Sequence, residues 1–122
     1  MNNYQNQLKK KMDEYIHFVY KQTKDFPKQE MYGGTSQWRR CTLSIILNYI
    51  EGYARKKPLI RLNFLEISYG SLMESDYLLD FFKEEGFLSQ ERYNQGLELA
   101  KQIGAMLWTE ISNLEKSISK QI

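Results

Sequence analysis

Apolar residues recur at helical spacing in four segments of this 122-residue chain, which are residues 4–24, 36–54, 58–85 and 90–119. In the first segment the apolar positions from Leu8 to Tyr20 follow one another at steps that place them on one continuous helical stripe. No alternating strand pattern and no internal repeat appears in the sequence. We therefore predict an all-α fold, an antiparallel up-down-up-down four-helix bundle, with residues 1–122 forming a single domain.

Short turn signals separate these segments. A Phe-Pro step should end the first helix, because proline disfavours a helical residue before it. Small polar residues favour a helix N-cap, proline favours the first turn of a helix, and glycine favours the position after its end. The residues that we expect in these turns and caps are Phe26-Pro27, Gly33-Gly34, Thr35, Ser36, Pro58, Gly86 and Ser89.

The second segment is apolar on nearly every side, which predicts a helix buried among the other three. Polar residues nevertheless line one of its faces, and buried polar groups need partners. In the third segment Gly70 and Ser71 interrupt an apolar run, and small residues permit another helix to cross closely. We therefore predict that Asn48 and Glu51 meet Ser71 or Glu74 across Gly70. The whole predicted seam is Ser44, Asn48, Glu51, Gly70, Ser71 and Glu74.

This polar seam has two interpretations. As a functional site, it would place the two carboxylates of Glu51 and Glu74 in a groove. As a structural feature, its members would satisfy one another where two helices cross. We favour the structural interpretation, because no nucleophile or phosphate-binding loop accompanies the carboxylates.

The fourth segment has more apolar positions than one core should need. Its heptad seam consists of Tyr93, Leu97, Ala100, Gly104, Leu107, Ile111, Leu114 and Ile118. A second strip beside the seam consists of Leu99, Ile103, Met106 and Glu110. Phe18 likewise lies off the main stripe of the first segment. We therefore expect a homo-oligomer that buries these residues between identical chains, and a heterologous contact that closes would give a ring.

Charge is divided unevenly along the chain, although the formal net charge is only +2. Residues 1–61 contain 12 Lys and Arg and 5 Asp and Glu, giving +7, whereas residues 62–122 contain 5 and 10, giving −5. A basic half can bind nucleic acid, or it can attract the acidic half of the same or a neighbouring chain. The candidate nucleic-acid contacts are Arg39, Arg40, Arg55, Lys56, Lys57 and Arg61.

The turn at Arg55-Lys56-Lys57 should be exposed, and a ring would repeat it around one rim. The sequence has no aromatic RNA-recognition motif, so binding would be to nucleic-acid backbone or shape. The alternative is a solvated turn in which Arg55 pairs with Glu51, four residues before it.

Catalytic and metal sites find little support in the sequence. Glu14 and His17 have the spacing of a di-iron bundle motif, but such a site needs two of these pairs and the chain has one histidine. Cys41 lies on an apolar helix row, where a buried and unreactive thiol is expected. We therefore expect no enzymatic activity, no metal or other cofactor, and no small-molecule substrate.

The N-terminal stretch MNNYQNQLKKK has no apolar run of the kind found in a signal peptide. No uncharged apolar stretch approaches the roughly 18 residues of a membrane span. A single cysteine fits a reducing compartment. We therefore expect a cytoplasmic protein that does not associate with membranes.

Three stretches of the chain resemble the 23S rRNA intervening-sequence protein family, also called the four helix bundle protein family. They are FPKQEMYGGTSQWRRCTLSIILNYIEGYARK, FLEISYGSLMESDYLL and EEGFLSQERY, within about residues 19–115. The chain departs from the family pattern at Cys41, at Ser68-Tyr69 and at Ile46, where the family has proline; we expect a straighter second helix without it. The matching residues are Gln37, Arg40, Ser44, Ile45, Asn48, Glu51, Gly52, Phe64, Leu65, Gly70, Ser71, Glu74, Gly86, Phe87 and Leu88.

The resemblance implies a four-helix bundle but does not fix a biochemical role. Some family members are encoded inside insertions in large-subunit rRNA genes. A similar bundle, the accessory protein of diversity-generating retroelements, forms a pentameric barrel and works with RNA and a reverse transcriptase, so by analogy we expect a pentamer. Our leading hypothesis is a non-enzymatic, oligomeric RNA-binding or accessory protein. The alternative hypothesis is a protein-interaction scaffold with no nucleic-acid role.

Overall fold

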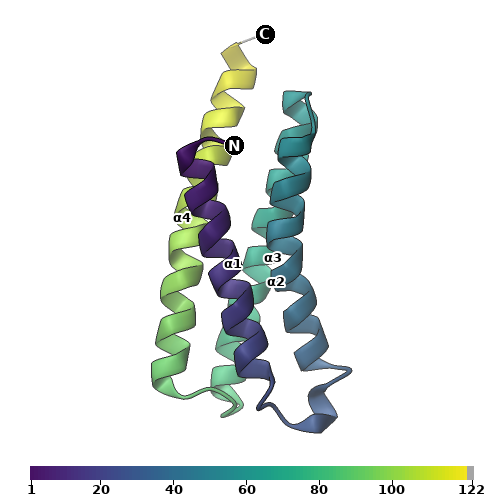
Figure 1. The fold of residues 1–122 in the computed structure, drawn as a ribbon, viewed down its shortest axis with the longest axis vertical. Coiled ribbons are helices and arrows are strands. Elements are labelled where there is room, and N and C mark those ends of the chain that lie inside the picture. The colour runs from purple at the N-terminus through teal and green to yellow at the C-terminus, as the bar shows by residue number, and fades with distance from the viewer. Residues whose placement is uncertain (121–122) are drawn as a thin grey trace.

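The computed structural model describes residues 1–120, which form four long α-helices and no strand (Figure 1). The elements are α1 (Asn3–Thr23), the short 3-10 helix η1 (Lys28–Glu30), α2 (Gly34–Ala54), α3 (Pro58–Glu84) and α4 (Gln90–Lys120). Consecutive helices run in opposite directions, and each helix packs against two neighbours, with α1 and α4 closing the square. The predicted antiparallel four-helix bundle is confirmed, with each helix boundary within two residues of its predicted place.

The connection between α3 and α4 follows the predicted chemistry. Gly86 has a φ angle of +81°, a left-handed conformation that glycine adopts without a steric penalty. The amide of Phe87 donates to the carbonyl of Phe82 at 2.9 Å, and the Gly86 amide donates to Lys83 at 3.1 Å, which closes the end of α3. The Ser89 hydroxyl then accepts the Arg92 amide at 3.2 Å in the first turn of α4.

The predicted N-cap of α2 at Thr35 or Ser36 is wrong. The cap position is Gly33, and the carboxylate of Glu30 in η1 accepts a hydrogen bond from the Gly34 amide at 3.1 Å. Thr35 is instead buried within the first turn of the helix. The 3-10 turn thus supplies the acceptor that the sequence pattern assigned to a hydroxyl side chain.

Aromatic side chains fill the end of the core near η1. Phe26 lies between Trp38, Phe82 and Phe87, with ring centroids 4.9 to 6.0 Å apart. These rings come from the α1–α2 connection, from α2, from α3 and from the α3–α4 connection. Their contacts hold both loops of this end against the same core.

Ser75 of α3 is the polar centre of the core. Its hydroxyl is fully buried and lies 2.7 Å from the Tyr15 hydroxyl and 3.0 Å from Nε1 of Trp38, which donates to it. Ser68, also fully buried, donates to the Ile45 carbonyl at 2.6 Å. Buried polar groups in this region are therefore hydrogen-bonded across helices, as a stable core requires.

The prediction that α2 is buried on nearly every side is wrong. Its row of Trp38, Cys41, Ile45, Tyr49 and Gly52 is buried, as expected. On its solvent side, however, Leu47 is 58% exposed and Ile50 is 39% exposed. The backbone of α2 lies beside α1, α3 and η1, and no element described in residues 1–120 covers the side that carries Leu47 and Ile50.

The predicted surplus of apolar residues on α4 and α1 is also wrong. The buried row of α4 is Gly96, Ala100, Ile103, Leu107 and Ile111, so Ile103 from the second strip belongs to the core. Phe18 is only 6% exposed, because its ring fills the space beside Gly96, where a Cβ atom would come within 2.7 Å of it. Leu99 and Met106 pack against the same core.

Candidate nucleic-acid interface

The turn between α2 and α3 presents exposed cations at the end of the bundle where the N-terminus and the end of α4 also lie (Figure 1). Arg55, Lys56 and Lys57 are all exposed. Pro58 occupies the first turn of α3, where its fixed φ angle suits a helix start. In residues 1–120, neither lysine has an acidic partner within the 4.0 Å of a salt bridge, so both ammonium groups are available to a ligand.

Arg55 and Arg61 have structural partners. The Arg55 guanidinium forms an ion pair with Glu51 and lies 5.3 Å from the centre of the Phe64 ring. Arg61 donates to the Gly52 carbonyl at 3.2 Å and to the Arg55 carbonyl at 2.9 Å. These bonds satisfy carbonyl groups at the end of α2, which a helix leaves without internal partners. Arg61 therefore holds the turn in place, while Lys56 and Lys57 have no acidic partner in the described part of the chain.

The other two predicted arginines lie near the opposite end of α2. Fifteen residues separate Arg40 from Arg55, about 22 Å of helix. Arg39 donates to the Thr23 hydroxyl at 2.8 Å and stacks over Tyr20, so it joins α1 to α2. Arg40 is exposed. The six predicted contacts therefore form two separate groups on one chain.

A cluster next to the turn was missed by the sequence argument. The half-buried carboxylate of Glu110 on α4 accepts hydrogen bonds from the hydroxyl groups of Tyr49 and Tyr53 on α2. Burial, followed by the bond to Glu110, raises the pKa of both phenols above the ordinary tyrosine value, so they remain donors. Arg61 lies 4.9 Å from the centre of the Tyr53 ring. The available signal was Glu110 itself, an acidic residue within an apolar strip.

The predicted polar seam forms only in part. The hydroxyls of Ser44 and Ser71 lie 2.8 Å apart, and the amide of Asn48 donates to Ser44 within α2. These bonds join α2 to α3 through short hydroxyl groups. Ser68 and Ser75 were not predicted to belong to the seam, although they continue Ser71 at steps of three and four along the inner side of α3.

The two glutamates predicted for the seam and its glycine do not take part in the contact between α2 and α3. Glu51 pairs with Arg55 on its own helix and its side chain is 44% exposed, so its predicted contact with α3 is wrong. Glu74 and Gly70 are exposed, and a Cβ atom at Gly70 would meet nothing within 4 Å. The close approach between α2 and α3 occurs at Gly52, where a Cβ atom would come within 3.3 Å of Leu65 and Phe64. The two carboxylates therefore do not form a buried pair.

Comparison with known proteins identifies the family of this chain. The family model described as 23S rRNA-intervening sequence protein matches residues 4–109. The chain belongs to this family. No curated protein matches the chain.

A solved structure has the same fold as this chain. It is the crystal structure of a protein with unknown function from the S23 ribosomal protein family of Bacteroides thetaiotaomicron VPI-5482. The TM-score is 0.79 at 21% sequence identity, with 85% of this chain and 97% of that chain covered. Nothing in these comparisons tests the likeness to the retroelement accessory protein, which stays a prediction.

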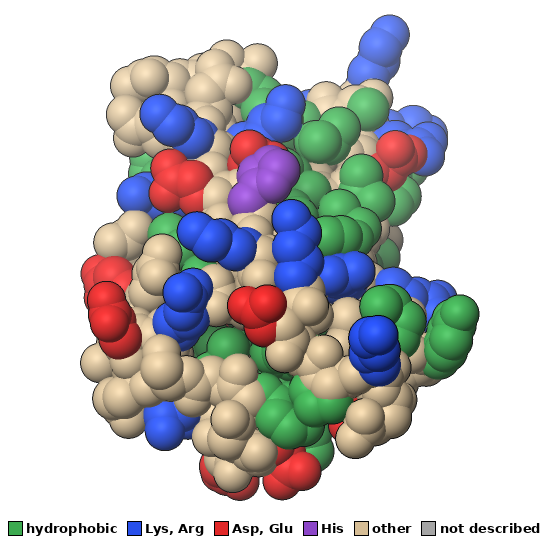
Figure 2. All heavy atoms as spheres, turned by 60° about the horizontal axis from the view of Figure 1, so that its bottom comes forward, with side chains coloured by type: hydrophobic (Ala, Val, Ile, Leu, Met, Phe, Trp, Pro, Cys, Tyr) green, Lys and Arg blue, Asp and Glu red, His purple; other side chains and the backbone are tan. Residues whose placement is uncertain are grey.

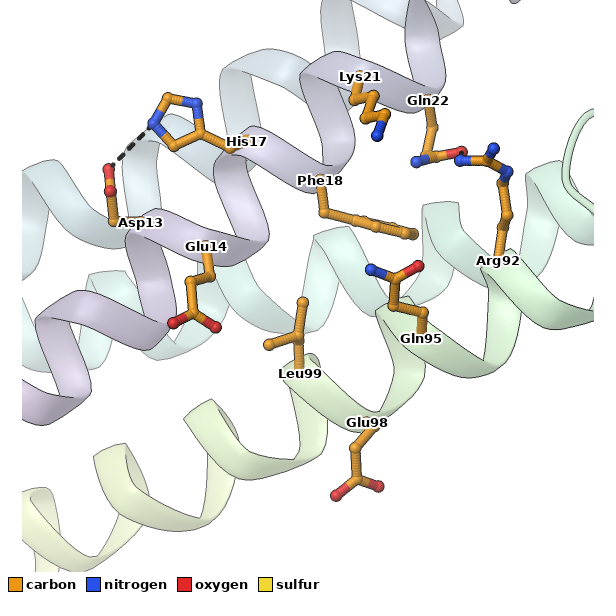
Figure 3. A pocket seen from close by; sticks show the side chains of 10 residues that line it. All are labelled: Asp13, Glu14, His17, Phe18, Lys21, Gln22, Arg92, Gln95, Glu98 and Leu99. Atoms are coloured by element: carbon orange, nitrogen blue, oxygen red, sulfur yellow. Dashed lines mark hydrogen bonds and ion pairs between the residues drawn. The ribbon is translucent and has the colours of Figure 1, made fainter.

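In this chain, a hollow of about 620 Å³ lies between α1 and α4 (Figure 3). It is separate from the basic turn between α2 and α3. Cations and carboxylates both line it, and Arg92 donates to Gln22 at its edge at 3.1 Å. His17 lies 3.5 Å from Asp13 and does not join Glu14 in a ligand set. Within residues 1–120 no three His, Cys, Asp or Glu side chains are grouped as metal ligands.

Cys41 is buried, as predicted for a structural thiol. Burial raises the pKa of its thiol to about 11, so the reactive thiolate is disfavoured near neutral pH. None of the helices described in residues 1–120 is long and apolar enough to cross a membrane.

Proposed function

We propose that this chain is a non-enzymatic, homo-oligomeric protein that binds RNA through its phosphate backbone at the α2–α3 turn. The proposal rests on Lys56 and Lys57, two exposed ammonium groups without acidic partners among residues 1–120, on a turn that Arg61 holds in place. Phosphate groups bind such lysines and release counterions, which gives affinity without base recognition. The family description refers to an intervening sequence of 23S rRNA, which makes RNA the nucleic acid to test.

Assembly would strengthen this weak single contact. A closed homo-oligomer, five chains by the resemblance, would repeat the same turn at one rim and engage several phosphates of one RNA molecule. Linked contacts of this kind increase the overall affinity without any new interaction at each site. Arg40, Lys21 and Lys24 would form a second basic region near the other end of the bundle, and Figure 2 shows both cationic and acidic side chains around the histidine.

The buried chemistry of the bundle supports a binding role over a catalytic one. The Cys41 thiol has a raised pKa and hydrogen-bonds the Trp38 carbonyl. The Tyr49 and Tyr53 hydroxyls are engaged by Glu110. Each of these groups is therefore committed to a partner within the fold.

A salt titration of RNA binding tests the proposal. The probe is a fluorescent oligouridine, with an RNA duplex as a second probe, and the variant is K56Q/K57Q. The matched control is K28Q/K101Q, which removes two exposed lysines that lie away from the turn. We expect a several-fold loss of affinity in K56Q/K57Q alone. On single-stranded RNA, its plot of log Kd against log salt should lose about 0.7 in slope per lost contact, or about 1.4 per chain.

Three results would overturn this function: no RNA binding at low salt, binding that does not depend on salt, or an equal loss of affinity in both double variants. Circular dichroism and thermal melting of each variant show whether the fold is retained. Both substituted positions in each variant are exposed, so little change in melting temperature is expected.

A further inference from the structure

The solvent side of α3 is apolar along most of its length. It carries large side chains that are between 37% and 65% exposed, which are Leu59, Ile60, Ile67, Met73, Tyr77 and Phe81. These side chains define the α3 outer face. The opposite side of the same helix fills the bundle core. A helix that is apolar on both sides normally has neighbours on both sides, yet none of the other described elements covers this face.

Gly70 lies midway along the α3 outer face. A glycine inside a helix costs about 0.5–1 kcal/mol relative to alanine, and no neighbouring helix of the same chain requires it here. Beside it, the rings of Tyr69 and Trp108 are tilted by 50° with their centroids 5.3 Å apart, and they line a shallow hollow of about 330 Å³. The missing side chain thus leaves a notch on the surface that can admit a side chain from outside.

The charged residues on the α3 outer face are acidic, and the exposed Asn63 beside them is neutral. Glu66 and Glu74 are exposed, and α3 has no Lys or Arg between Arg61 and Lys83. An occupant should therefore combine apolar side chains with cations. This chain presents such a surface elsewhere, in the groove between α1 and α2.

The α1–α2 groove combines the required features. It is a hollow of about 440 Å³ that includes Lys9, Lys10 and Ile46 in its lining, and Leu43 and Ile50 lie along the same side of α2. Lys10 is exposed, and Ile50 is 39% exposed. Asp13 also lines the hollow, but the two lysines outnumber it, so this apolar surface with a net positive charge complements the apolar and acidic α3 outer face.

We propose that the α3 outer face of one chain docks into the α1–α2 groove of a second copy. This inference rests on the homo-oligomer of the proposed function and identifies its two contact surfaces. The two surfaces differ, so the contact is heterologous and leaves one unused surface of each kind in a pair. Repetition of the contact then gives a closed ring or an open chain.

Sedimentation and light scattering of surface variants test the pairing. Wild-type protein at micromolar concentration should have a mass above the 14.6 kDa of one chain. I67D/Y77D should damage the α3 outer face, and K9E/K10E should damage the groove, so each variant alone should be monomeric. M31D/Y32D, which changes two exposed apolar residues outside both surfaces, should assemble like the wild type.

An equimolar mixture of the two monomeric variants gives the decisive measurement. The mixture still contains one intact α3 outer face and one intact groove, so it should form a heterodimer with the mass of two chains. Failure to pair, with both variants folded by circular dichroism, would overturn the heterologous contact. Variants that remain assembled would overturn the two surfaces while leaving the homo-oligomer in place.

A wild-type mass of one chain would overturn the inference together with the homo-oligomer. RNA binding through the α2–α3 turn is measured separately, so its loss would leave the pairing result unaffected. Assembly of the K56Q/K57Q variant should match the wild type, because both lysines lie outside the α3 outer face and the α1–α2 groove.

Discussion

The inner and outer faces of α3 are both rich in large apolar side chains, but their polar residues differ. On the inner face, Leu72 and Leu79 are fully buried beside Ser68 and Ser75, whose hydroxyls are hydrogen-bonded across helices. On the outer face, Ile67 is 50% exposed, and the polar side chains of Asn63, Glu66 and Glu74 are also exposed to solvent. A short hydroxyl can be satisfied inside a closed core by one or two partners, whereas an ionised carboxylate needs several hydrogen-bond donors, a cation or water. The kind of polar residue therefore separates the core side of this helix from its solvent side.

Matched truncations on the two faces should give the largest contrast. Leu72→Ala on the inner face should lower the free energy of unfolding by about 2–5 kcal/mol, because it removes buried contacts and leaves a cavity. Ile67→Ala on the outer face should cost about 0.5 kcal/mol or less in the separated chain. Urea unfolding at several protein concentrations measures both changes.

The dependence on concentration sharpens this contrast. The loss from Leu72→Ala should be the same at every concentration, whereas the loss from Ile67→Ala should grow as chains associate. Equal losses for the two variants at low concentration would show that the outer face already belongs to the core of a single chain.

The buried hydroxyl of the inner face gives the next largest effect. Ser75→Ala leaves the Tyr15 hydroxyl and the Trp38 indole without their shared partner, which should cost about 1–3 kcal/mol. Ser117→Ala on the exposed part of α4 is the matched control and should change stability by about 0.5 kcal/mol or less. Calorimetry of the two variants makes the comparison, and similar melting temperatures would remove the role assigned to Ser75.

Much of the fold could be predicted from the sequence, because local signals decided it. The Gly86 turn, the Ser89 cap and the buried row from Trp38 to Gly52 each depend on residues close together in the chain. Residues far apart in the sequence caused the error at Phe18. Phe18 enters the core because Gly96 on another helix leaves room for its ring, and periodicity within α1 cannot show that.

The candidate interface was predicted less well, for a related reason. Charge pattern found the exposed turn at Lys56 and Lys57, but it could not show that Arg61 binds carbonyl groups of α2 or that Arg39 binds α1. Glu51 was expected to reach α3, yet it pairs with Arg55 four residues later, which the sequence had offered as the alternative. A linear pattern shows the sign of a charge and its possible partners on the same helix, whereas a partner on another helix or a backbone carbonyl appears only when the chain is folded.

The smallest expected effect concerns Asp76, which follows the buried Ser75 on α3. One of its carboxylate oxygens is buried and has no hydrogen-bond partner among residues 1–120. Burial, with a smaller contribution from Asp80, raises the pKa of this carboxyl above its ordinary value. The folded state therefore holds the proton more tightly than the unfolded state. The resulting stabilisation is present at low pH and is lost as the pH rises through the folded-state pKa.

At pH 7 the ionised Asp76 should therefore oppose folding, and Asp76→Asn should remove that cost. We expect this variant to be more stable than the wild type at pH 7, by about 1 kcal/mol or less, with the difference shrinking towards pH 3. The matched control is Asp80→Asn, because Asp80 is exposed and accepts the Tyr93 hydroxyl at 2.6 Å, so its removal should give no such gain. Urea unfolding of both variants between pH 3 and pH 7 makes the measurement. A loss of stability in Asp76→Asn at pH 7 would contradict this prediction. It would mean that the ionised Asp76 carboxylate has a favourable polar partner at the border between the inner and outer faces of α3.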